Sequence, residues 1–376
     1  MGSTSCIEVE VVVETEVEKC QLIYLHFLVR LLKYPFFIKL LSWEYWPTAI
    51  VHAPTMLMWL WFAVKSKALF FFTRANPVIE TGGVLGESKI NILNRIPSHF
   101  LPKTIFINRS QTSIPVITQL LSEKGMTYPL IAKPNIGERG FLVEKLTSEE
   151  DLRQYLDQTP VDFLIQEFIS LPIEISVLYY RLPTASTGHI TSLCIKETLK
   201  VKGDGQSTVE ELMQAYPRAI LQLARFRKKY PAILKHIPEK GSIVELEPIG
   251  NHSRGTTFLN GNHHIDDQLV RVFDTIGFQM DDIYYGRFDM KCASMAKLKA
   301  GKDFKILEFN GIASEPAHIY QPGYSIFKAY RDLWQHWKII FQISQEQKQK
   351  GIPAMSWKEW TAHHQSYRQY LKAAES

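Results

Sequence analysis

Two short apolar runs that carry cation-binding groups constrain the fold of this chain more than any other feature. The first run ends near Asp289, two residues after Arg287, and the second, Phe304 to Phe309, carries Glu308 and Asn310. Residues i and i+2 of a strand point to one face, so Glu308 and Asn310 would face a single site, as would Arg287 and Asp289. If the runs pair as neighbouring strands, two carboxylates and one amide oxygen converge. This set favours Mg²⁺, whose coordination is usually completed by water and substrate phosphates.

An exposed hairpin with charged outer positions is the alternative that these residues alone leave open. The composition, 45% hydrophobic and 22% charged over 376 residues, indicates a folded protein of two or three packed subdomains. The net charge of +5 is small for this length, the basic residues are scattered, and no nucleic-acid motif occurs. Nucleic acid is therefore not expected as a partner. Four widely spaced cysteines without a CxxC pair, and no recognisable secretory leader, favour a reduced, cytoplasmic setting.

The N-terminal part differs from the remainder of the chain. Residues 1 to about 20 are acidic and β-branched, and residues 21–74 are rich in aromatic groups with flanking cations. The span Thr48 to Val64 has no formal charge, although it contains His52 and Pro54. Three interpretations stay open for it: a helical pair packed on the main domain or on a second subunit of a homodimer, peripheral contact with the inner face of a membrane, and a short membrane span.

From Asn76 onward the pattern is mixed α and β. Short helices are expected at about 88–94, 114–125 and 266–276, and a helix capped by Ser207 or Thr208. Strands are expected at 104–108 and in PLIAKP, VEKL, DFLIQEFI, EISVLYYRLP and HITSLCIKETLKV, the last read as one strand. The segment from Arg218 to Lys240 reads as a polar connector, and residues 325–376 read as helical with tryptophan anchors. The predicted divisions are 1–75, 76–125, 126–210, 211–325 and 326–376.

Several segments upstream of the acidic runs have the properties of a nucleotide site. Lys133 precedes a turn with Gly137 and Gly140, whose glycines permit close backbone approach to phosphates. The segment IQEFI, Ile165 to Ile169, can cross between subdomains and present backbone groups to an adenine edge. GGVLGESK departs from the phosphate-loop pattern GxxxxGK[ST] and so argues against that class of NTPase. Taken singly, each of these segments is equally compatible with an ordinary surface turn or strand end.

In this order, the segments resemble the ATP-grasp superfamily. The segments that carry the resemblance are ESK, LIAKPNIGERG, IQEFI with EIS, VKGDGQST, NHSRGTTF, RFDMK and LEFNG, between about residues 86 and 325. Within the superfamily they are most similar to the D-alanine–D-alanine ligases and to the ATP-grasp part of cyanophycin synthetases. The resemblance implies an α+β fold in which two subdomains sandwich ATP.

The resemblance also implies roles for individual residues. Lys89 and Lys133 match the lysines that contact ATP phosphates, and Ile136 to Gly140, with Gly137, match the flexible loop over them. Gln166, Glu167, Phe168 and Ile169 match the adenine hinge, and Glu174 matches the ribose-side acid. Arg287 matches the arginine that stabilises the transferring phosphoryl group. Asp289, Glu308 and Asn310 match the ligands of Mg²⁺, for which Mn²⁺ can substitute.

The implied reaction activates a carboxylate as an acyl phosphate, with release of ADP, and then joins it to an amine. The expected partners are a small-molecule carboxylate and an amine, of amino-acid or lipidic type. Arg254 can clamp the substrate carboxylate, or it can serve the phosphates or the surface. Phosphorylation of a hydroxyl and nucleotide binding without turnover are the alternative functions. The chain departs from the D-alanine ligases after LEFNG, where it continues IASEPAHIY, and at its N-terminus, where the aromatic segment stands in place of their substrate domain.

Overall fold

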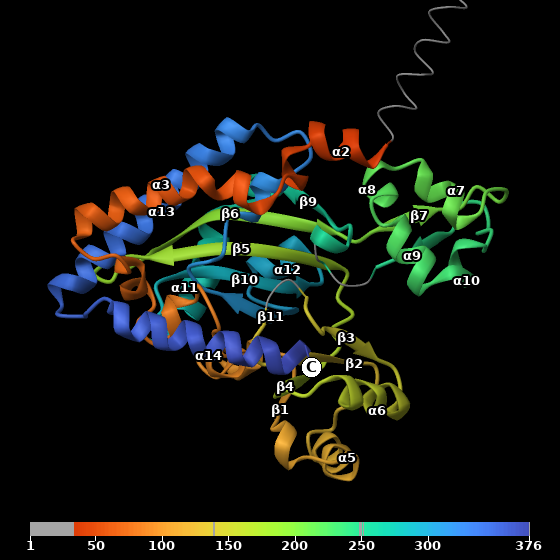
Figure 1. Cartoon of the computed structure of the whole chain (residues 1–376), viewed down its shortest axis with the longest axis horizontal. Helices are drawn as coiled ribbons and strands as arrows, with labels where there is room; N and C mark the ends of the chain where they lie inside the picture. The colour runs from red at the N-terminus through yellow and green to blue at the C-terminus, as the bar shows by residue number, and fades with distance from the viewer. Residues whose placement is uncertain (1–33, 138–139, 248–249, 251, 376) are drawn as a thin grey trace, which may run out of the picture. The chain divides into compact units, whose positions relative to one another are not determined.

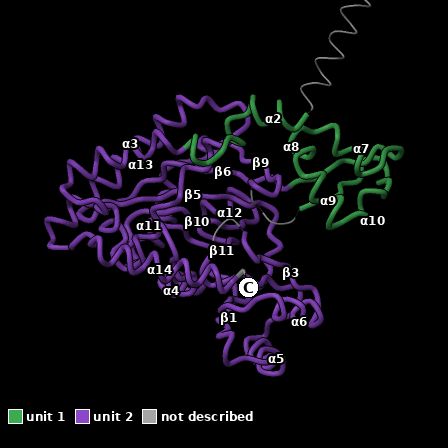
Figure 2. The backbone as a smooth tube through the Cα atoms, in the orientation of Figure 1, with its two compact units in different colours: residues 1–51, 199–248 green, residues 52–198, 249–376 purple. Residues whose placement is uncertain are grey.

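The computed structural model describes residues 34–137, 140–247, 250 and 252–375. The N-terminal acidic arm expected at residues 1 to about 20 lies outside these residues. The chain divides into two compact units: unit 1 comprises Met1–Val51 and Leu199–Pro248, and unit 2 comprises His52–Thr198 and Ile249–Ser376 (Figure 2). Both helices and strands are present, which confirms the α+β class.

A four-stranded antiparallel sheet forms one part of unit 2 (Figure 1). Its order is β1-β4-β2-β3, from β1 (Thr104–Ile107), β4 (Phe163–Glu167), β2 (Leu130–Pro134) and β3 (Glu144–Leu146). Helices α5 (Ile114–Glu123) and α6 (Glu149–Gln158) supply Ile117 and Leu152 to the core beneath it. Ser148 caps α6 by accepting a hydrogen bond from the amide of Asp151, as its sequence pattern predicts.

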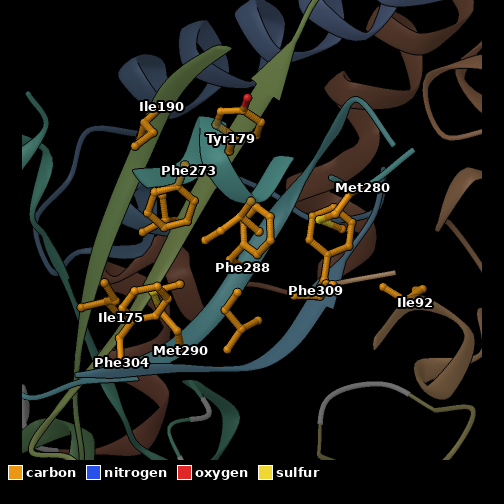
Figure 3. Close-up of a cluster of buried hydrophobic side chains, with 14 of the residues drawn as sticks. Ile92, Ile175, Tyr179, Ile190, Phe273, Met280, Phe288, Met290, Phe304 and Phe309 are labelled. Atoms are coloured by element: carbon orange, nitrogen blue, oxygen red, sulfur yellow. The ribbon is translucent and has the colours of Figure 1, made fainter. Parts of the chain in front are cut away.

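The second sheet of unit 2 has five antiparallel strands in the order β11-β10-β5-β6-β9. These are β11 (Phe304–Asn310), β10 (Tyr285–Cys292), β5 (Ile173–Arg181), β6 (Gly188–Glu197) and β9 (Thr257–Asn260). One face of the sheet packs on α11 (Asp267–Gly277), which Asp266 caps. Figure 3 shows this core, in which the rings of Phe273 and Phe288 lie 5.3 Å apart. Because strand side chains alternate, the residues between the core positions of β10 point to the opposite face.

One end of that opposite face is covered by helices and by the segment Phe71–Ala75 (η2). The covering helices are α3 (Thr48–Ser66), α13 (Ile326–Gln349) and α14 (Trp357–Glu375). Phe71 and Ile343 are fully buried there, and Phe62 of α3 packs against Trp334 and Phe341 of α13. The predicted helical C-terminus is therefore present, and of its predicted tryptophan anchors Trp337 and Trp360 pack on this core, whereas Trp357 is 64% exposed. The rest of this face carries the polar residues of the candidate site.

The N-terminal segment is helical where the structure describes it. Along α3 one side packs on α13, in agreement with the core-packing interpretation, while Leu57, Trp61 and Val64 on the other side are 69%, 51% and 70% exposed. Within residues 34–375, apart from the undescribed positions, no helix has the length and apolar character needed to cross a bilayer. The membrane-span interpretation of Thr48 to Val64 is therefore not supported.

Unit 1 has its own core and departs from two expectations. The HITSLCIKETLKV segment forms two strands instead of one: β6 ends at Glu197, and β7 (Lys200–Lys202) pairs with β8 (Ile243–Glu245) in a separate sheet. The expected connector from Arg218 to Lys240 instead contains three short helices. They are α8 (Pro217–Ile220), α9 (Leu223–Lys229) and α10 (Pro231–Leu234).

These departures have a physical cause in scattered apolar residues. With α7 (Val209–Gln214), the three helices bury one small core, to which they contribute Val209, Met213, Leu223, Phe226 and Leu234. Few apolar positions spaced among many lysines and arginines give a weak periodic signal, although together they are sufficient to fold a short segment. Thr208 caps α7 through a complete capping box with Glu211, which confirms Thr208 as the cap.

The described chain also contains the short helices α2, α4 and α12. In unit 1 there is α2 (Pro35–Leu41). In unit 2 there are α4 (Lys89–Leu93), which lies within the expected helix at about 88–94 and is capped by Ser88, and α12 (Met295–Lys299), which connects β10 to β11. Because α12 lies between them, β10 and β11 are neighbouring strands and not a tight hairpin.

Candidate nucleotide and metal site

Strands β10 and β11 bring the predicted metal ligands together. Their antiparallel register places Asp289 opposite Glu308 and Arg287 opposite Asn310, with a bulge after Asp289. The Asn310 side-chain amide donates to Asp289 Oδ2 at 3.2 Å. The pairing expected from the two apolar runs is thus present, and the Asp289 side chain is only 13% exposed. The alternative of an exposed hairpin is therefore wrong.

Asp289 is held in its charged form by its neighbours. Ser176 donates to Asp289 Oδ1 at 2.5 Å, and Arg287 Nε donates to the same oxygen at 3.1 Å. Burial would raise the pKa of Asp289, but Arg287, Lys196 and Ser176 outweigh it and hold that pKa well below its usual range. The carboxylate therefore presents anionic oxygen atoms at any physiological pH.

Lys196 is a component of this site that the sequence reading missed. Its Nζ lies 3.3 Å from Glu174 Oε1 and 3.5 Å from Asp289 Oδ2, and its side chain is only 6% exposed. Burial lowers the pKa of Lys196, but the carboxylates of Asp289 and Glu174 more than compensate and raise it. The available signal was a single lysine inside an apolar strand, directly opposite Glu174 in the register. Recognising it requires knowing which strands are neighbours.

The two predicted phosphate lysines both reach strand β11. Lys89 Nζ lies 3.7 Å from Glu308 Oε1. Lys133 is buried, and its Nζ donates to the carbonyl of Leu307 at 2.9 Å and to Gln166 Oε1 at 3.1 Å. Burial lowers the pKa of Lys133 to about 8, with Lys89 lowering it further and the charges of Glu308 and Asp289 opposing the shift. An anion arriving here would raise that pKa again.

The glycine turn after β2 is attached to the rest of the site at two points. Lys89 Nζ donates to the carbonyl of Gly137, and Arg254 Nη2 donates to the carbonyl of Gly140 at 2.9 Å. Gly137 and Gly140 both have positive φ, 143° and 75°, which supports the expectation that glycine is required there. Ile136 is half-buried, and residues 138–139 of the predicted loop lie outside the described chain.

The predicted hinge is partly incorporated into β4. The Gln166 side chain donates to Thr104 Oγ1 at 3.1 Å, and the Glu167 amide donates to the carbonyl of Lys103 at 2.9 Å. The chain therefore leaves the sheet at Phe168 and Ile169, beyond the end of the strand. The ammonium groups of Lys145 and Lys291 lie 4.1 Å and 5.4 Å from the ring centroid of Phe168. An aromatic ring with adjacent cations suits a planar, electron-rich ligand.

The donor set fits a divalent cation. Asp289 and Glu308 supply carboxylates and Asn310 supplies an amide oxygen from one face of the sheet, and each carboxylate already attracts at least one cationic side chain. Within the described residues there is no group of three or more histidine, cysteine, aspartate or glutamate side chains that could hold a metal. A set of two carboxylates and one amide is suited to a hard cation whose coordination phosphate and water complete.

Arg287 connects this site to the segment after Asn310. Besides its bonds to Asp289, its Nη1 donates to the carbonyl of Glu315 at 3.3 Å. Backbone hydrogen bonds also hold this segment in place, because the amides of Ile312 and Ala313 donate to the carbonyls of Gly82 and Gly83 at 3.1 and 2.9 Å. The part of the sequence that departs from the D-alanine ligases therefore contacts Arg287 directly.

No protein-family model and no curated protein matches this chain. Similar solved structures include the VanG D-Ala:D-Ser ligase from Enterococcus faecalis, at 11% identity and a TM-score of 0.40, over 71% of this chain and 63% of that one. A D-alanine–D-alanine ligase from Bacillus anthracis complexed with ATP is 12% identical with a TM-score of 0.40, over 72% and 70%. A bifunctional glutathione synthetase from Pasteurella multocida is 13% identical with a TM-score of 0.35, over 66% and 36%.

Proposed function

We propose that this protein is an ATP- and Mg²⁺-dependent ligase that activates a carboxylate as an acyl phosphate and joins it to an amine. The observation that carries the proposal is the meeting of two lysines, an arginine, two carboxylates and an amide on one face of the sheet. Cations flanking hard oxygen ligands are what phosphoryl transfer requires, since its transition state is stabilised by position and charge. Mg²⁺, or Mn²⁺ in its place, would be held by Asp289, Glu308 and Asn310 and would neutralise phosphate charge.

In this proposal each residue of the site has its own role in the reaction. Lys133 and Lys89 hold phosphate oxygens of ATP, the turn at Gly137 and Gly140 closes over them and excludes water, and Arg287 holds the transferring group. A substrate carboxylate oxygen attacks the γ-phosphorus, and the bond to the β–γ bridging oxygen breaks, which gives ADP and the acyl phosphate. An amine nitrogen then attacks the acyl carbon, and inorganic phosphate leaves.

Two other functions predict different products. A kinase of the same fold would phosphorylate a hydroxyl, and a nucleotide-binding scaffold would not turn ATP over. The discriminating experiment is a screen of carboxylates crossed with amines, lipid amino acids included, with ADP release as the readout. Release that needs both a carboxylate and an amine supports the ligase. Release with a hydroxyl compound alone would indicate the kinase, and no release under any combination would indicate the scaffold.

We further propose that the exposed side of α3 contacts an anionic lipid surface. The helix carries no acidic residue, its last turn carries Lys65, and Lys67 follows directly. The ammonium group of Lys65 lies 4.9 Å from the ring of Trp61, which is half-exposed. A broad apolar strip with cations at its end and tryptophan at its border is the pattern of a helix that lies in a membrane interface. A lipidic substrate would be consistent with this location.

A further inference from the structure

Glu315 contacts the arginine of the candidate site through its backbone, and its side chain carries a carboxylate that phosphoryl transfer does not explain. The residue's own carbonyl accepts the hydrogen bond from Arg287. On its side chain, Oε2 accepts from the hydroxyl of Tyr320 and Oε1 lies 3.2 Å from Nδ1 of His52. The carboxylate is thus fixed in position and remains 23% exposed, while the ring of His52 is 31% exposed. Both groups are therefore within reach of a ligand.

The sign of the charge at Glu315 identifies the kind of ligand. Arg287 is the group expected to stabilise negative charge on the transferring phosphoryl, whereas Glu315, whose backbone carbonyl Arg287 contacts, adds a negative charge that this transfer does not need. A carboxylate at this position can bind a second substrate that carries a positive charge. A primary amine is an ammonium ion near neutral pH, and it must be brought to the acyl carbon and lose a proton before it can attack.

The origin of the two residues supports a role in substrate recognition. Glu315 belongs to the IASEPAHIY segment, and His52 lies in α3, the aromatic N-terminal segment. These are the two places at which the sequence departs from the D-alanine ligases, and the structure joins them by the 3.2 Å contact between His52 Nδ1 and the Glu315 carboxylate. A contact between the two divergent segments, one of which also contacts Arg287, is where a difference in substrate would be accommodated.

We propose that Glu315 binds the ammonium group of the amine substrate and takes its proton, with His52 and Tyr320 positioning the carboxylate. This rests on the ligase function proposed above. The ammonium transfers one proton to Glu315, and the nitrogen lone pair attacks the acyl carbon. The C–N bond forms, the bond from the acyl carbon to the phosphate oxygen breaks, and the second nitrogen proton leaves with inorganic phosphate. The site therefore takes a cationic primary amine.

The test uses a nucleophile that needs no ammonium site. Hydroxylamine is largely uncharged at neutral pH and traps an acyl phosphate as a hydroxamate. In Glu315→Gln, which keeps the size of the side chain and an acceptor oxygen, we expect kcat/KM for amines to fall about 100-fold or more while hydroxamate formation is unchanged. The full-length protein is assayed with a panel of amino acids as carboxylates and amines. Glu123→Gln, on the exposed surface of α5, is the matched control.

Every outcome of this experiment either supports or contradicts the amine site at Glu315. Amine-dependent turnover that survives in Glu315→Gln would overturn the amine site, and so would equal loss of the amine and hydroxylamine reactions, since that result indicates general damage. Glu315→Asp retains the charge and should recover part of the amine reaction if the variants fold alike. If the unmodified protein forms no hydroxamate with any carboxylate of the panel, the ligase proposal fails first, and the amine site fails with it.

Discussion

Asp289 is the residue at which most of the charged groups of the site meet. Arg287, Lys196, Ser176 and the Asn310 amide all contact its carboxylate. Asp289→Asn retains the shape but removes the charge, so ATP turnover should fall at least about 1,000-fold. Steady-state ADP release measures this, with circular dichroism to verify folding. Asp303→Asn, an exposed carboxylate just before β11, is the control. Turnover that matches the control would refute the metal assignment.

Lys133 gives the site a dependence on pH. Because burial lowers its pKa to about 8 in the nucleotide-free protein, the side chain is protonated below that pH and increasingly neutral above it. Phosphate binding raises the pKa, so ATP binding above pH 8 should take up a proton, and affinity should decline by up to about tenfold per pH unit. Below pH 8 neither effect is expected.

Calorimetry of ATP binding in two buffers of different ionisation enthalpy at pH 8.5 measures this uptake. In Lys133→Arg the guanidinium stays charged, so uptake should disappear and affinity should no longer depend on pH in this range. Equal uptake by both proteins would mean that another group titrates.

Among the elements, the glycine turn after β2 has the clearest functional consequence. Its attachment through Arg254 and the Gly140 carbonyl should control how well water is excluded once ATP is bound. Arg254→Ala is expected to raise the ratio of phosphate released to amide formed, because more acyl phosphate is hydrolysed. Arg271→Ala, on the exposed side of α11, should leave that ratio unchanged. An unchanged ratio in Arg254→Ala would contradict this role in water exclusion and would favour the substrate-clamp role predicted from the sequence.

The elements also show what local sequence can and cannot specify. The pairing of β10 with β11 and the caps Ser148 and Thr208 were predictable, because alternation and capping depend on neighbours in sequence. Lys196 and the Glu315–His52 contact were not, since each depends on which distant segments lie side by side. The break between β6 and β7 was missed because Thr198 and Leu199 continue a strand-like pattern across it.

For the whole molecule, the exposed side of α3 predicts binding to anionic vesicles. The full-length protein should float with phosphatidylserine-containing vesicles, less with purely zwitterionic ones, and less at high salt. Leu57→Gln combined with Trp61→Gln should abolish flotation without altering ATP turnover. Removing all residues before Asn76 would be a poor test, because Phe62, Phe70 and Phe71 belong to the core of unit 2.

Val116→Gln, which replaces an apolar and 45% exposed residue on α5, serves as the control for this pair. Flotation that persists in the double variant would overturn the lipid proposal. A homodimer that the double variant converts to a monomer, with no vesicle binding by either protein, would assign the same surface to a second subunit instead.

The two ends of the unit 1 segment that is inserted between β6 and β9 are hydrogen-bonded to each other. The Leu199 carbonyl accepts hydrogen bonds from the amides of Leu246 and Glu247, at 2.8 and 3.3 Å. Closing a loop whose ends already meet has an entropic cost that grows only with the logarithm of its length. Relatives of this chain could therefore lengthen, shorten or replace the intervening helices without shifting the register of β6 and β9. Length variation among homologues should concentrate here, and a reporter domain inserted at Gly205 should leave ATP turnover intact.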